Sequence, residues 1–96
     1  MVVIERINLP DIKLPKNSDL RNALLLVLHE DEFVSSKQIN ERIIQNLNLS
    51  EEQINLLHNS SKSSRTELAY RLAWIRTALK KEGLISRHED GKWSKN

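Results

Sequence analysis

Apolar residues in the second half of the chain recur with the period of an α-helix. They are spaced by four, three and four residues, at Leu68, Leu72, Ile75 and Leu79. Residues at this spacing lie on one face of a helix, where they can pack into a core. Gly83 follows, and glycine often ends a helix in the left-handed conformation. The pattern predicts a long helix that begins near Arg65 and stops at Gly83.

A hairpin pattern follows this helix directly. Leu84-Ile85 and Trp93 lie on either side of Asp90-Gly91, and Asp-Gly is a frequent dipeptide in tight hairpin turns. The sequence therefore predicts two short antiparallel strands. We expect Trp93 to belong to the core, and we expect Trp74, next to the apolar stripe of the helix, to pack under the hairpin.

The first half of the chain predicts an earlier helix that is capped by Asn17 or Ser18 and ends at Glu30-Asp31-Glu32. Its apolar stripe is Leu20, Ala23, Leu24, Val27 and Leu28. The next two residues, Phe33-Val34, form a short extended stretch that we expect to pair with the hairpin as a third strand.

Two further helices lie between this stretch and the long helix. Ser35 or Ser36 caps the first, whose buried face is Ile39, Ile43 and Leu47. Ser50 begins the second, where Ser50 and Gln53 form a capping-box pattern. The order helix, short strand, helix, helix, helix, hairpin predicts a mainly α fold with a small β-hairpin. This is a winged helix-turn-helix with an extra helix before the recognition helix, formed by residues 17–96 and preceded by an N-terminal arm, residues 1–16.

The distribution of charge favours a nucleic-acid ligand. The net charge is only +2, but residues 1–48 hold six Lys/Arg against seven Asp/Glu, whereas residues 49–96 hold nine against six. The surplus surrounds the predicted recognition helix and wing, where a phosphate-binding face would need it. A solvated helix surface is the alternative explanation of these cations.

The start of a recognition helix and the wing supply the candidate DNA contacts. Those near the helix start are Lys62, Ser63, Ser64, Arg65, Thr66, Tyr70 and Arg71, and those on the wing are Arg87, His88 and Lys92. Tyr70 could equally be half-buried against a neighbouring helix. Arg76, Lys80 and Lys81 lie toward the helix C-terminus, where cations oppose the helix dipole.

Composition argues against several other classes. The chain of 96 residues contains no cysteine, which excludes disulfides and thiolate zinc sites. No apolar run approaches the roughly 20 residues that span a bilayer, and the first residues do not resemble a signal peptide, so we expect a cytoplasmic protein. The three histidines, His29, His58 and His88, are far apart in the sequence. We expect no metal, no cofactor and no enzymatic activity.

Several strings resemble the N-terminal domain of Mrr-type restriction proteins, over roughly residues 9–94. They are Ala73-Trp74-Ile75-Arg76, Leu79-Lys80-Lys81, Gly83-Leu84-Ile85, Gly91-x-Trp93 and, upstream, Leu49-Ser50-Glu51-Glu52 with Leu56-Leu57. The resemblance implies a DNA-binding winged helix joined to a separate C-terminal nuclease that cuts modified foreign DNA. The nuclease is absent here, and the ending at Asn96 suggests a piece of a longer protein.

The sequence therefore predicts a non-catalytic domain that binds double-stranded DNA, the recognition part of an Mrr-like, modification-dependent restriction endonuclease. Its partners would be the duplex, a nuclease domain of the parent chain and a second copy in a homodimer, with no membrane. Two alternatives stay open: a stand-alone winged-helix transcriptional regulator, and a winged helix used for protein interaction or dimerisation.

Overall fold

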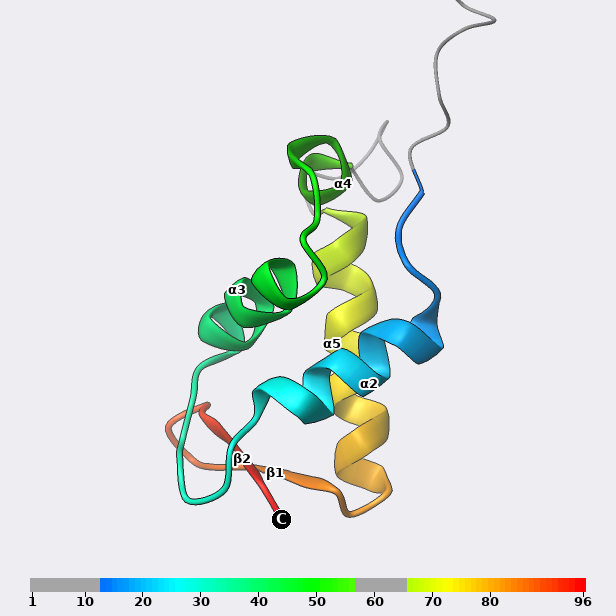
Figure 1. The fold of residues 1–96 in the computed structure, drawn as a ribbon. Coiled ribbons are helices and arrows are strands. Elements are labelled where there is room, and N and C mark those ends of the chain that lie inside the picture. Colours follow the sequence, from blue (N-terminus) through cyan, green and yellow to red (C-terminus); the bar gives the residue numbers. More distant parts are fainter. Residues whose placement is uncertain (1–12, 57–65) are drawn as a thin grey trace, which may run out of the picture.

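The computed structural model describes residues 13–56 and 66–96. The helices are α2 (Asn17–Val27), α3 (Ser36–Asn46), α4 (Glu51–Asn55) and α5 (Glu67–Lys81), and the strands are β1 (Ile85–Arg87) and β2 (Trp93–Lys95). In Figure 1, α2 crosses α5, α4 lies at the N-terminal end of α5, and the hairpin lies at its C-terminal end. The predicted fold class, mainly α with a small antiparallel hairpin, is confirmed.

Helix α2 buries the predicted stripe but begins earlier than its predicted cap. Leu20, Ala23, Leu24, Val27 and Leu28 are all buried. The N-cap residue is Lys16, whose side chain makes no capping bond, and its carbonyl accepts from the Leu20 amide at 3.0 Å. The prediction of Asn17 or Ser18 as the cap is wrong, because the backbone becomes helical directly after Lys16 and both residues lie inside the first turn.

Serine capping boxes start α3 and α4. The sequence predicts the box at Ser50 and, for α3, a serine cap at Ser35 or Ser36. The Ser35 hydroxyl accepts from the Gln38 amide at 3.1 Å, and the Gln38 side chain accepts from the Ser35 amide at 3.0 Å. Ser50 and Gln53 repeat this arrangement, at 3.2 and 2.8 Å. Two donors at each helix start, which would otherwise lack a partner, are thereby satisfied.

Helix α5 also follows its pattern. Thr66 is the N-cap, and its hydroxyl accepts from the Ala69 amide at 3.2 Å. The predicted stripe of Leu68, Leu72, Ile75 and Leu79 is buried. Gly83 has a φ of +81°, the left-handed conformation that ends the helix and directs the chain into β1.

The hairpin is tied to the first half of the chain. Strands β1 and β2 pair antiparallel, with Arg87 opposite Trp93. Val34 forms a bridge to Trp93, with the two N–H···O bonds at 2.9 and 2.7 Å. The predicted third strand is thus present as a single bridge. Gly91, with a φ of +85°, lies in the turn, and its amide donates to the His88 carbonyl at 2.9 Å.

The two tryptophans differ in their burial. Trp93 is 6% exposed and belongs to the core, as expected, whereas Trp74 is 60% exposed. The prediction that Trp74 packs under the hairpin is wrong. A helix turns by about 100° per residue, so a residue two positions after Leu72 and one before Ile75 points away from the buried stripe.

The residues before α2 belong to the predicted arm. Residues 1–12 lie outside the described residues, but Leu14 packs against the core, and the carbonyl of Lys13 accepts from Gln53 Nε2 at 2.8 Å. Within the described ranges, no helix has the length and apolarity needed to cross a membrane. The same ranges contain no group of three or more His, Cys, Asp or Glu suited to hold a metal ion.

Candidate nucleic-acid interface

The described candidate contacts lie in two groups at opposite ends of α5. Thr66, Tyr70 and Arg71 belong to the N-terminal half of the helix, whereas Arg87, His88 and Lys92 belong to the hairpin at its other end (Figure 1). Lys62, Ser63, Ser64 and Arg65 lie outside the described residues. A ligand that contacts both groups must therefore extend along the length of α5.

Arg71 is held by an ion pair within its own helix. Its Nε lies 2.7 Å from Glu67 Oε2, one turn earlier, and its side chain is 35% exposed. Arginine carries five N–H donors, so this contact at Nε leaves the two η nitrogens to reach a ligand. Glu67 therefore orients the guanidinium at the surface of α5.

From the first group toward the second runs the surface that we call the outward face of α5: Tyr70, Trp74, Thr77 and Lys81. Trp74, Thr77 and Lys81 are exposed and Tyr70 is half-buried. The rings of Tyr70 and Trp74 meet edge to face, with centroids 6.4 Å apart and an interplanar angle of 70°. Trp74 is absent from the contacts predicted from the sequence, although its angular distance from the buried stripe indicates an exposed position.

Two hollows flank the indole of Trp74. One lies toward the start of α2 and is lined by Asn17, Glu67, Tyr70, Arg71, Trp74, Ile75 and Ala78. The other is lined by Tyr70, Ala73, Trp74 and Thr77. The exposed indole of Trp74 thus lines both hollows, one together with Ala78 and the other together with Ala73.

The hairpin of β1 and β2, which we call the wing, is anchored by Trp93. Contacts of this side chain join three elements. Its Nε1 donates to the Ser36 hydroxyl at the start of α3, at 3.0 Å. Arg76 of α5 and Arg87 of β1 each place their Cζ atom 5.8 Å from the centroid of the ring. A guanidinium at this distance from an indole is within the range of a cation–π attraction. These contacts fix the wing relative to both α3 and α5.

Arg76 is a buried residue, not a solvated cation near the helix C-terminus. It is 8% exposed, and its Nη1 donates to Asn40 Oδ1 of α3 at 2.9 Å. Lys80 and Lys81, by contrast, are exposed in the last turn of α5. The interpretation of these three cations as one group is therefore wrong for Arg76, which joins α5 to α3.

His88 also has a structural contact within the wing. Its ring stacks on that of Phe33, with centroids 4.4 Å apart and an interplanar angle of 9°. Its Nε2 lies 2.7 Å from the Ser94 hydroxyl. Phe33 itself is 58% exposed, and Lys92 is exposed in the turn. The wing therefore presents an aromatic pair next to exposed cations.

Two ion pairs outside this surface connect elements of the fold. Arg42 of α3 donates to both carboxylate oxygens of Glu32, at 2.6 and 3.0 Å, and to the Val27 carbonyl at 3.0 Å. The hydrogen bonds from Arg42 lower the pKa of Glu32 from 4.5 to about 2. Arg21 of α2 pairs with Glu82 at the end of α5. These two arginines therefore stabilise the fold.

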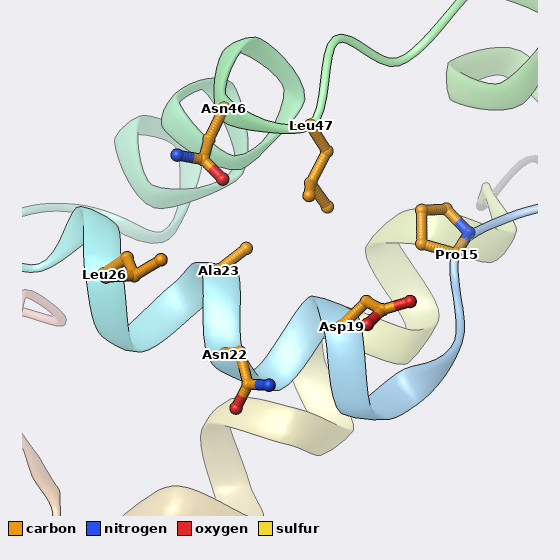
Figure 2. A pocket seen from close by; sticks show the side chains of 7 residues that line it. All are labelled: Pro15, Asp19, Asn22, Ala23, Leu26, Asn46 and Leu47. Atoms are coloured by element: carbon orange, nitrogen blue, oxygen red, sulfur yellow. The ribbon is translucent and has the colours of Figure 1, made fainter.

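A separate hollow lies between α2 and the end of α3 (Figure 2). It is lined by Pro15, Asp19, Asn22, Ala23, Leu26, Asn46 and Leu47. The charged group among these residues is the carboxylate of Asp19, which repels phosphate. The hollow beside α5 differs from this one in holding a cation, Arg71, as well as a carboxylate, Glu67.

Fold and surface together define a small helical domain in which a basic helix leads into a two-stranded wing. The sequence model of the Mrr N-terminal domain matches residues 18–94, and the chain belongs to this family. The family resemblance noted from the sequence is thus confirmed, and it associates the chain with restriction systems. Searches of curated proteins and of solved structures found no significant match.

Proposed function

We propose that this chain is a non-catalytic domain that binds double-stranded DNA and directs an Mrr-like, modification-dependent restriction endonuclease to its substrate. The observation that carries the proposal is the basic helix α5, on which the part of the chain that the structure describes leaves one face exposed, next to a wing that Trp93 holds in place. A nuclease domain of the parent protein is the second partner, and the cytoplasm is the compartment in which the domain meets foreign DNA.

The shape of the molecule supports this role. The major groove of B-DNA admits one α-helix, and α5 offers the face that neither α2 nor the core covers. The hairpin lies beyond the end of the same helix (Figure 1), where it can follow the adjacent backbone. Arg87 and Lys92, both exposed, are the wing cations that would contact phosphate there.

The charge of α5 supports the same role. Between Glu67 and Lys81 the helix carries four cationic side chains and one anionic one, and three of the cations, Arg71, Lys80 and Lys81, reach its surface. Phosphate contacts position a protein on DNA, and each contact releases counterions from the duplex, so binding weakens as salt rises. Arg71, held at the surface by Glu67, is the described side chain best placed to make such a contact.

A protein-docking domain is the second candidate function. Protein interfaces concentrate their binding energy in Trp, Tyr and Arg, and Tyr70, Arg71 and Trp74 are neighbours on α5. Docking through this patch would depend weakly on salt, whereas DNA binding would depend on it steeply. Salt dependence therefore separates the two functions.

The test is fluorescence anisotropy of a labelled duplex of roughly 25 bp, long enough to span a module of this size, titrated with the chain at two salt concentrations. We expect salt-sensitive binding, and we expect Arg71→Ala to reduce the slope of log K against log salt by about one unit. Lys13→Ala, which removes an exposed cation outside α5 and the wing, is the matched control and should leave the slope unchanged. Absence of binding at low salt would overturn the proposal.

A further inference from the structure

The outward face of α5 has a feature that phosphate binding does not explain. Its central residue, Trp74, is 60% exposed, although an indole is among the largest apolar groups a chain can present. Its side chain lines two hollows of the surface, one together with Ala78 and the other together with Ala73. The core needs nothing from this ring, so its exposure points to contact with a ligand.

The charge of the helix selects the kind of ligand. A second copy packed through the same face would bring together two helices on which the cations that reach the surface, Arg71, Lys80 and Lys81, outnumber the one carboxylate, Glu67. Like charges at an interface oppose association. A polyanion has the complementary charge. The ligand must therefore combine negative charge with an apolar surface that an indole can cover.

The major groove of DNA provides both. Its edges are lined by phosphate, and the apolar group among its base edges is the C5-methyl group of thymine. We infer that Trp74 packs against thymine methyl groups in the major groove, so that this domain prefers thymine-containing steps. The inference rests on the proposed function and names the base chemistry that the outward face of α5 contacts.

The neighbours of Trp74 fit this contact. Tyr70 packs edge to face on the indole, at 6.4 Å between centroids, and limits its rotation. Arg71, three residues earlier and oriented by Glu67, lies on the rim of the same hollow, where it can bind a phosphate beside the contacted base. Tyr70 is accordingly a positioning residue for the indole, and Arg71 supplies the salt-dependent part of the binding.

Substitution of thymine by deoxyuridine tests the inference directly. Deoxyuridine keeps the hydrogen-bonding groups of thymine and lacks only its methyl group. Anisotropy measures the binding of a mixed-sequence duplex and of its fully deoxyuridine-substituted counterpart. Three chains are titrated: the wild type, Trp74→Ala and Phe33→Ala, which removes an exposed ring that stacks on His88 of the wing. We expect the wild type to bind the thymine duplex about threefold to fourfold more tightly for each buried methyl group.

The three chains give distinct outcomes. Trp74→Ala should bind both duplexes equally, whereas Phe33→Ala should keep the preference for thymine. Equal binding of the two duplexes by the wild type would overturn the inference and leave the proposed DNA-binding function intact. Absence of salt-sensitive binding to either duplex would overturn that function instead. Self-association in sedimentation, lost in Trp74→Ala, would also overturn the inference, because the face would then be a protein interface.

Discussion

The indole nitrogen of Trp93, close to the end of the chain, donates a hydrogen bond of 3.0 Å to the hydroxyl of Ser36, the first residue of α3. The guanidinium groups of Arg76 and Arg87 each lie 5.8 Å from the centroid of the same ring. One side chain therefore connects the wing, α3 and α5, and the relative positions of these elements depend on it.

Trp93→Ala should destabilise the fold by about 3–5 kcal/mol, because it removes a buried aromatic ring and leaves a cavity. Ser36→Ala removes only the hydrogen bond and should cost about 1 kcal/mol. Urea unfolding followed by far-UV circular dichroism measures both. Trp74→Ala is the matched control, because the same substitution at an exposed position should change stability by no more than about 0.5 kcal/mol. Equal effects of the two tryptophan substitutions would contradict the assignment of Trp93 to the core.

Gly83→Ala should destabilise the domain by roughly 1–2 kcal/mol, because residues with a Cβ atom are strained in the left-handed region. A Cβ atom at Gly83 would meet nothing within 4 Å, so the expected loss comes from the backbone conformation. Gly83→Asn should be less harmful, since asparagine tolerates this conformation better. Thermal unfolding distinguishes the two variants, and similar losses for both would point to a steric cause.

The ion pair of Glu32 and Arg42 should make stability depend on pH. The pKa of Glu32 is lowered from 4.5 to about 2, first of all by its hydrogen bonds to Arg42, so the ionised carboxylate favours the folded state. This contribution is complete above pH 4.5 and is lost as the pH falls toward about 2. Glu32→Gln should therefore be less stable than wild type at pH 7, and the difference should shrink across that interval.

Urea midpoints of the wild type and Glu32→Gln at pH 7, 4 and 2.5 provide the measurement. Glu30→Gln, at an exposed position nearby, is the control and should follow the wild type at each pH. A difference between wild type and Glu32→Gln that persists unchanged at pH 2.5 would show that the carboxylate is not the source of the effect.

Arg71→Ala should weaken DNA binding while leaving the stability of the domain nearly unchanged. The ion pair with Glu67 joins residues one helical turn apart, and such pairs contribute about 0.2–0.5 kcal/mol. The melting temperature should therefore change little, while affinity for a DNA duplex falls at low salt. A clear loss of stability would assign Arg71 to the framework of the helix, and unchanged affinity would remove it from the interface.

Local sequence patterns were sufficient to predict most of the fold. The stripes of α2 and α5, the serine cap of α3, the capping box at Ser50 and the glycine that ends α5 each depend on residues within one or two turns. A short sequence window contains all of that information. The pairing of Val34 with Trp93 was predictable only because the order of elements is that of a winged helix. The N-cap of α2 was not predictable, because the helix begins directly after Lys16 without a capping hydrogen bond from a side chain.

The candidate surface was harder to predict, because burial depends on the packing of several elements. Arg76 resembles a solvated cation in the sequence, but its position beside the stripe of α5 brings it to Asn40 on another helix. Trp74 resembles a core residue by its chemistry, and only its angular position on the helix reveals its exposure. The side chain type suggested the wrong environment for both residues.

The link between Ser36 and Trp93 spans 57 positions of the chain, and the backbone bridge at Val34 spans still more. Closing such a separation carries a large entropic penalty that only the packed core offsets. The wing therefore depends on the packed core to remain in place. Hydrogen exchange at the amides of Val34 and Trp93, which bond to each other's carbonyl groups, should then proceed only by global unfolding, and both should report the full stability of the domain.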